Sequence, residues 1–187
     1  MTLRSANAIH ERGYWLDNHG HFCDPGLAPE LLKIIPRLSS FWDMGCGSGD
    51  YTRFLLQNGR CGFGLDGNPN LPNEFCLVKG DLSMPLILPA HDWVLCLEVG
   101  EHVPQAYEGT LISNLHRHNR EGMILSWFPP IGRPVGHGHV NEKYNNEIRA
   151  LIEPLGYISD MDAEKSLREA AFAWWFQQSL MVFRRKK

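Results

Sequence analysis

The sequence predicts an α/β fold in which helices cover a mostly parallel sheet. From Ser40 onward, short apolar runs alternate with segments of helical periodicity, as in consecutive βαβ units. One run, at 93–97, is apolar throughout, as in a central strand covered on both faces. The 187 residues, of which 43% are hydrophobic, can build a sizeable core, and we expect a single domain over 1–187.

In the first half of the chain, one helix is expected before the first strand, and strands and helices then alternate. Leu27, Leu31, Ile34 and Leu38 are spaced to form one apolar stripe on a helix. Gly59 follows the next helical segment and can end it as a C-cap. The expected elements are helices at 25–38 and 51–58, and strands at 41–44, 61–65, 75–78 and 93–97.

The second half continues the alternation. Pro129 ends a strand because proline cannot continue a ladder of hydrogen bonds. Asn141 can cap the helix that follows the loop at 129–140, and Gly156 can end it. The expected elements are helices within 105–118 and at 141–155 and 163–176, and strands at 123–128, 157–159 and 179–183, which makes seven strands in all.

Composition argues against several kinds of partner. The net charge is −3 with acids and bases mixed, so nucleic acid is not expected, and the basic run at 184–187 is interpreted as a solvated chain end. No stretch reaches the ~18 apolar residues that span a bilayer, and 1–10 lack a signal-peptide pattern, so we expect a cytoplasmic protein without a membrane partner. The cysteines form no CxxC pair and are interpreted as reduced, without a metal: Cys23, Cys46, Cys61, Cys76 and Cys96.

A glycine-rich loop, DMGCGSGD at 43–50, follows the first strand. A loop between a strand and a helix presents bare backbone N–H groups to an anionic or polar ligand. The spacing of Gly45, Gly47 and Gly49 is GxGxG, not the GxGxxG of a dinucleotide-binding turn, and no lysine marks a phosphate loop. Asp43 would repel a pyrophosphate and suits a ligand with an ammonium or sulfonium charge. A nicotinamide cofactor is therefore disfavoured.

Acidic residues also end the next strands. Asp66, followed by Gly67, lies where an acid can accept hydrogen bonds from both hydroxyls of a ribose. Asp81 could accept a hydrogen bond from an adenine amine while Leu82 covers the ring, although a strand-end aspartate is more often a helix cap or turn former. Glu98 ends the fourth strand. Together these residues favour an adenosine without phosphates.

These motifs resemble, in type and order, the class I S-adenosylmethionine-dependent methyltransferases over about 42–126. The resemblance implies a Rossmann-like three-layer sandwich with a seven-stranded sheet of order 3-2-1-4-5-7-6 and strand 7 antiparallel. The segment LEVGEHVP at 97–104 is similar to the small-molecule branch, including quinone-biosynthesis enzymes, and lacks the Asn-Pro-Pro-Tyr motif of enzymes that methylate amines of nucleic acids. The cofactor implied is S-adenosylmethionine, held by Asp43, Gly45, Cys46, Gly47, Gly49, Asp66, Gly67, Asp81, Leu82 and Glu98.

We therefore expect methyl transfer to an oxygen or nitrogen of a small-molecule acceptor by in-line displacement, which requires alignment and removal of a proton. His139 and His137, in the loop at 129–140, are the candidate bases, and His139 is preferred because it adjoins the expected helix start. A loop histidine bonded to backbone, or one bound to a metal, is the alternative. Glu101 and His102 could contact the acceptor, or Glu101 could simply begin a helix.

The N-terminal segment at 1–24 is expected to act as a lid. Tyr14, Trp15 and His19 within it, together with Trp127, are candidate substrate contacts, and core packing is the alternative for Tyr14 and Trp15. Two other functions stay open, namely methylation of a protein or other large acceptor and cofactor binding without catalysis. The chain is expected to be a monomer or a homodimer.

Overall fold

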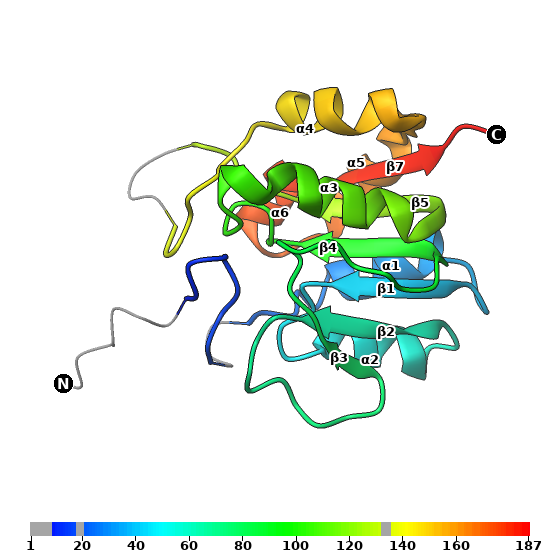
Figure 1. Ribbon diagram of the computed structural model, residues 1–187. Coiled ribbons are helices and arrows are strands. Elements are labelled where there is room, and N and C mark those ends of the chain that lie inside the picture. Colours follow the sequence, from blue (N-terminus) through cyan, green and yellow to red (C-terminus); the bar gives the residue numbers. More distant parts are fainter. Residues whose placement is uncertain (1–8, 18–20, 132–135) are drawn as a thin grey trace.

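The computed structural model describes residues 9–17, 21–131 and 136–187, and it contains one seven-stranded sheet with helices on both faces (Figure 1). The strands are β1 (Ser40–Met44), β2 (Cys61–Asp66), β3 (Leu77–Lys79), β4 (His91–Leu97), β5 (Asn119–Ser126), β6 (Tyr157–Ser159) and β7 (Met181–Arg185). The α-helices are α1 (Leu27–Ile34), α2 (Asp50–Gln57), α3 (Glu108–Arg117), α4 (Asn145–Ile152), α5 (Met161–Ala170) and α6 (Trp174–Ser179). Short 3₁₀ helices, η1 (Gln105–Tyr107) and η2 (Glu153–Leu155), precede α3 and follow α4.

The strand order is β3-β2-β1-β4-β5-β7-β6, which confirms the order implied by the resemblance. The first five strands pair in parallel, and β7 runs antiparallel to both β5 and β6. In the centre of the sheet, Asp43 on β1 lies opposite Gly64 of β2 and Leu95 of β4. The carboxyl ends of the parallel strands therefore meet at one edge, beside the residues that the sequence singled out.

The core has one layer on each face of the sheet. Helices α3 and α4 cover one face, and α1, α2, α5 and α6 cover the other (Figure 1). Apolar side chains of the central strands, such as Val94 and Leu95, are fully buried between these layers. Among the residues described, no helix is long and apolar enough to cross a membrane.

The C-terminal helical segment differs from the sequence prediction. A single helix was expected at 163–176, but α5 ends at Ala170, and α6 begins only at Trp174. The backbone of Ala171 and Ala173 is extended because the buried carboxylate of Asp24 accepts the N–H groups of Phe172, at 2.9 Å, and Ala173, at 2.8 Å. Consequently β7 also starts later than predicted, at Met181.

Two further boundaries moved for local reasons. Helix α1 stops at Ile34, not Leu38, because Ile35 precedes a proline and takes an extended conformation. Helix α4 begins at Asn145, not Asn141: the side chain of Asn141 is buried and donates to Glu108 Oε2 at 2.9 Å instead of capping a helix.

Candidate functional site

A cavity of about 350 Å³ lies at the carboxyl edge of the parallel strands. Its walls are the glycine-rich loop after β1, the ends of β2 and β4, and residues that follow β3. The N-terminal segment, dark blue in Figure 1, crosses this edge, and the yellow loop that leads into α4 lies beside it. The cavity therefore brings together most of the residues that the sequence predicted as a site.

The glycine-rich loop adopts a backbone that side chains disfavour. Gly45, Gly47 and Gly49 all have positive φ angles, of 84°, 55° and 87°. The N–H of Gly45 donates to the carbonyl of Leu65 at 2.7 Å, which ties the loop to the end of β2. Gly45, Cys46 and Gly47 line the cavity, whereas Gly49 precedes α2 as its N-cap residue and lies outside the lining.

Asp43 is buried at the floor of the cavity. Its carboxylate accepts a hydrogen bond from the hydroxyl of Thr52 at 2.7 Å. Burial raises the pKa of Asp43 to about 7, against the effect of the Thr52 hydrogen bond and with a further contribution from the charge of Asp66. A positively charged ligand group beside Asp43 would favour its ionised form.

Asp66 is hydrogen-bonded to the glycine-rich loop. Its two oxygens accept the N–H groups of Gly47 and Asn68, each at 2.8 Å. Burial raises the pKa of Asp66, and these hydrogen bonds oppose the rise. The ring of Tyr14 packs directly on Gly67, where an added Cβ would lie 2.5 Å from the ring. Asp66 and Gly67 therefore form a wall that the N-terminal segment covers.

Asp81 lies at the far end of the cavity, after β3. One oxygen accepts the N–H of Ser83 at 2.9 Å and its hydroxyl at 2.6 Å. The other oxygen is 3.3 Å from Nη1 of Arg12, which belongs to the N-terminal segment. Leu82, beside it, is buried and lines the cavity. The carboxylate of Asp81 thus joins this wall of the cavity to the covering segment.

The N-terminal segment reaches deep into the site. His21 packs on Gly47, with Nδ1 2.1 Å from where a Cβ of that glycine would lie, and its buried Nε2 has no hydrogen-bond partner among the described residues. The ring of Trp15 lies 5.6 Å from that of His102. His19 falls outside the described residues, so its predicted contact with substrate stays a prediction.

Two glutamates follow β4, of which Glu98 is half-buried and Glu101 is fully buried. Glu98 has a left-handed backbone, with φ at 54°, and its N–H donates to Ser126 Oγ at 2.8 Å. The hydroxyl of Ser179 donates to Glu98 Oε1 at 3.2 Å, and burial raises the pKa of Glu98 to about 7. Glu101 is fully buried, and burial and the nearby charge of Glu98 raise its pKa well above the ordinary value.

His102 and His139 meet above these glutamates, with ring centroids 4.9 Å apart. Burial lowers the pKa of His102 to about 4, and burial also lowers the pKa of His139, which the hydrogen bond with Glu142 partly offsets. The loop that presents His139 is fixed to Glu101, because the Glu101 carbonyl accepts the N–H groups of Val140, at 2.8 Å, and of the next residue. Both imidazoles are therefore neutral near pH 7 and held in place.

The comparisons with known proteins agree with this architecture. No family model matches the chain, and no curated protein matches it either. Among solved structures, a TehB-like S-adenosylmethionine-dependent methyltransferase from Corynebacterium glutamicum superposes with a TM-score of 0.63 at 19% identity, over 90% of each chain. The chain has the fold of a class I methyltransferase.

Two further structures share this methyltransferase fold and contain ligands. Magnesium protoporphyrin IX methyltransferase from Synechocystis, with bound S-adenosylhomocysteine, matches with a TM-score of 0.61 at 20% identity, over 86% of this chain and 80% of that one. The 1,6-didemethyltoxoflavin N1-methyltransferase of Burkholderia thailandensis, with that substrate and S-adenosylhomocysteine bound, matches with a TM-score of 0.62 at 15% identity, over 88% and 80%.

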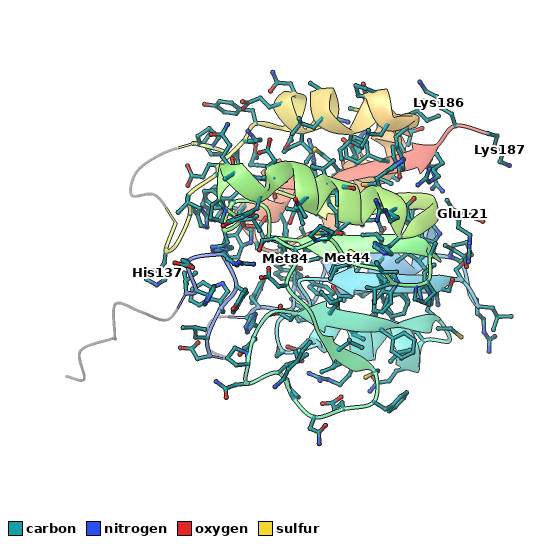
Figure 2. The ribbon with its side chains drawn as sticks, in the orientation of Figure 1. Met44, Met84, Glu121, His137, Lys186 and Lys187 are labelled. Carbon is teal, nitrogen blue, oxygen red and sulfur yellow. The ribbon has the colours of Figure 1, made fainter. Side chains whose placement is uncertain are left out.

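Two predicted contacts do not reach the cavity. Trp127 is 2% exposed in the core, packs on Gly100, and donates from Nε1 to the carbonyl of Asn141 at 2.6 Å. It therefore holds the loop of His139 in place rather than lining the site. His137 lies at the outer tip of the same loop, where Figure 2 labels it, with its ring 5.5 Å from that of Trp15. Of the two loop histidines, only His139 lines the cavity.

Sequence reasoning also missed three supporting residues. Glu142 Oε1 lies 3.0 Å from Nδ1 of His139, and the spacing of three residues between them was an available signal. Thr52 contacts Asp43 from the next element along the chain, nine residues away, and Arg12 contacts Asp81 from 69 residues away. No local pattern indicates either contact, because both depend on how the helix and the N-terminal segment pack on the sheet.

Proposed function

We propose that the chain is an S-adenosylmethionine-dependent methyltransferase that acts on an oxygen or nitrogen of a small molecule. The supporting observation is that Asp43, Asp66 and Asp81 line one cavity around the glycine-rich loop. Three carboxylates suit a cationic, phosphate-free adenosine ligand and would repel a pyrophosphate. The basic side chain that lines this cavity within the described residues, Arg12, is already paired with Asp81.

The residues present fit this cofactor. Asp43 and the backbone of Gly45 and Gly47 would hold its amino-acid end, Asp66 its ribose, and Asp81 with Leu82 its adenine. The unpartnered Nε2 of His21 and the contact of His21 with Gly47 place a hydrogen-bonding group over the same loop. When bound, S-adenosylmethionine supplies a methyl group on a positively charged sulfur, which leaves with the bonding electron pair.

His139 is suited to handle the acceptor's proton. Its Nδ1 donates to Glu142 at 3.0 Å, which leaves Nε2 as the basic nitrogen. In this proposal Nε2 takes the proton from the acceptor hydroxyl or amine as the new bond to the methyl carbon forms. Phe128, whose ring is 4.6 Å from that of His139, and Trp15 form apolar walls that exclude water from the acceptor.

The structural neighbours support the cofactor and the acceptor class. The Synechocystis and Burkholderia enzymes both contain S-adenosylhomocysteine, and the latter contains a small heterocyclic substrate. A cavity of about 350 Å³, partly covered by the N-terminal segment, is of the size that holds small ligands. The segment at 1–24 would then act as the lid predicted from the sequence.

Calorimetry tests this proposal directly. The purified chain should bind S-adenosylhomocysteine and should not bind NAD. Tight binding of NAD without binding of S-adenosylhomocysteine would overturn it. The variant His139→Ala should keep its affinity for S-adenosylhomocysteine but lose methyl transfer to an acceptor found by screening, and unchanged turnover would remove His139 from the mechanism.

A further inference from the structure

We propose that Glu101, His102 and His139 form a binding site for a divalent transition-metal ion inside the acceptor end of the cavity. One potential ligand atom from each residue lies within 4.8 Å of the others. All three side chains line the cavity, so a ligand can reach an ion at this position. The inference rests on the proposed function for its catalytic meaning, but binding of the ion can be tested without it.

The carboxylate of Glu101 is the strongest indication. The residue is 0% exposed, and neither of its oxygens has a hydrogen-bond partner among the described residues. Its nearest basic group is Nε2 of His102, 4.0 Å from Oε1. Burying an ionised carboxylate without a partner is costly, so such a group stays protonated unless a cation or a metal ion pairs with it. The half-buried Glu98, when ionised, adds negative charge beside Glu101.

Among the described residues, no lysine or arginine neutralises the negative charge of Glu98 and Glu101. Within the described ranges 9–17, 21–131 and 136–187, no lysine or arginine forms an ion pair with Glu98 or Glu101. The hydroxyl of Ser179 is neutral and contacts only Glu98. A divalent ion would neutralise both carboxylates and still leave room for an acceptor atom.

The two histidines are oriented as metal ligands are. Nδ1 of His139 is 3.0 Å from Oε1 of Glu142, and Nδ1 of His102 is 3.2 Å from the carbonyl oxygen of Gly138. In each imidazole Nδ1 therefore carries the hydrogen, and Nε2 presents its lone pair. Metal-binding histidines characteristically donate their other N–H to a carboxylate or a backbone carbonyl in this way.

The donor set indicates the kind of ion. Two imidazole nitrogens and one carboxylate suit first-row ions such as Mn²⁺, Co²⁺ or Zn²⁺ better than Ca²⁺, which prefers oxygen ligands. Three protein ligands leave positions open toward the cavity, as catalytic sites require. The ligands are also fixed in advance, since the loop of His139 is bonded to the backbone of Glu101.

An ion at this position would narrow the acceptor class and change the role of His139. A cation attracts a hydroxyl oxygen and makes its proton more acidic, whereas it repels a protonated amine. With the ion bound, Nε2 of His139 is a ligand, and the acceptor proton is released to solvent. The proposal therefore favours methylation of oxygen over methylation of nitrogen.

Metal titration of the full chain tests the site. After chelator treatment and dialysis, Mn²⁺ binding would be followed by the electron paramagnetic resonance signal of the free ion, and Zn²⁺ binding by calorimetry. We expect one ion per chain, and affinity at least about 10-fold weaker in Glu101→Gln and His139→Ala. Glu142→Gln, which removes the negative charge beside the imidazole but keeps an oxygen that can accept its N–H, should weaken binding by about 10-fold. Absence of binding to the wild type would overturn the proposal.

His137→Ala is the matched control, because it removes a histidine two residues from His139 that does not line the cavity. Its metal affinity should match that of the wild type. An equal loss in His137→Ala and His139→Ala would overturn the assignment of ligands. Calorimetry with S-adenosylhomocysteine on the same samples separates the two proposals: binding of S-adenosylhomocysteine without metal overturns only the metal site, and the reverse overturns only the proposed function.

Discussion

The hydroxyl of Thr52, on the first turn of α2, donates a 2.7 Å hydrogen bond to the carboxylate of Asp43 on β1. Both side chains are buried, and the bond opposes the rise that burial causes in the pKa of Asp43. Thr52 therefore increases the fraction of Asp43 that is ionised near pH 7. In the proposed site, the ionised form is the one that attracts the cofactor.

Thr52→Val should weaken cofactor binding without changing the shape of the side chain. A hydrogen bond to a charged group is worth about 1.5–3 kcal/mol, so its loss raises the pKa of Asp43 and leaves the residue mostly neutral at pH 7. Calorimetry should show S-adenosylhomocysteine bound about 10-fold more weakly at pH 7, with part of the loss recovered at pH 8.5. Thr52→Ser keeps the hydroxyl and should bind like the wild type; equal affinities for all three proteins would contradict the prediction.

Asp43→Asn should change stability in a pH-dependent way. The pKa of Asp43 is raised to about 7, above the unfolded value of about 3.9, so the folded protein retains a proton that the unfolded chain releases between these values. The contribution of Asp43 to the free energy of unfolding therefore falls as pH rises from about 4 to about 7, by at most roughly 4 kcal/mol. Urea unfolding should show that the free energy of unfolding of Asp43→Asn, relative to that of the wild type, is higher at pH 8 than at pH 5. The same difference in unfolding free energy at both pH values would refute this.

Asp81→Asn should reduce discrimination at the adenine. In the proposed site, the carboxylate accepts a hydrogen bond from the exocyclic amine, and the corresponding oxygen of S-inosylhomocysteine would be repelled. We expect the wild type to prefer S-adenosylhomocysteine over S-inosylhomocysteine by about 10-fold or more, because an unsatisfied buried acceptor costs about 1–3 kcal/mol. The variant should bind both with similar affinity in competition calorimetry. Arg12→Ala is the control that removes the other partner of Asp81 and should keep the preference.

Glu142→Gln should lower the pKa of His139. Burial already lowers this pKa, and the Glu142 carboxylate, 3.0 Å from Nδ1, opposes the effect because it stabilises the protonated imidazole. An NMR titration of chelator-treated protein should therefore find His139 protonated only at lower pH in the variant than in the wild type. Glu147→Gln, which alters the start of α4 instead, should leave the pKa of His139 unchanged. A His139 titration unchanged by Glu142→Gln would show that the contact is absent in solution.

Asp24→Asn should be nearly as destabilising as Asp24→Ala. All four partners of the carboxylate are donors: Oδ1 accepts the N–H groups of Gly26 and Leu27, and Oδ2 accepts those of Phe172 and Ala173. The amide of asparagine would turn an N–H toward one of these pairs. We expect each variant to lose about 3 kcal/mol of unfolding free energy at pH 7 by urea denaturation. A much milder loss in Asp24→Asn would contradict this account.

The pH dependence of the Asp24 variants follows from the sign of its pKa shift. Burial raises the pKa of Asp24, but the four backbone donors lower it by more, so that it lies below the ordinary value. The stabilisation is thus present above about pH 4 and is lost as pH falls through the folded pKa. The difference in unfolding free energy between the wild type and Asp24→Ala should therefore become smaller in strongly acidic buffer.

The sheet was predictable because its signals are local. Apolar runs, the prolines and glycines that end them, and the acids at their ends depend on neighbouring residues. The strand order had no such local signal and came only from the resemblance to the class I methyltransferases. The break between α5 and α6 had no such signal. Ala170, Ala171 and Ala173 favour a continuous helix, and the distant Asp24 interrupts it.

The candidate site was predictable in composition but less so in geometry. The cavity includes nine of the ten predicted cofactor residues, the exception being Gly49, because the carboxyl ends of parallel strands converge on one edge. The sequence did not predict that Trp127 turns into the core, or that Glu142 orients His139. Both depend on the path of the loop after β5, which is set by hydrogen bonds from Val140 and Asn141 to the backbone of Glu101.

The hydrogen bonds of Asp24 also have a consequence for biosynthesis. The amides of Phe172 and Ala173 follow it by 148 and 149 residues, and Trp175 and Phe176 just beyond them line the cavity together with Phe22 and Cys23 just before it. During translation, this side of the cavity cannot close before residues 172–176 have left the ribosome. A nascent chain that stops before Phe172 would therefore contain the sequence of β1 to β6 but would lack β7 and a finished binding site.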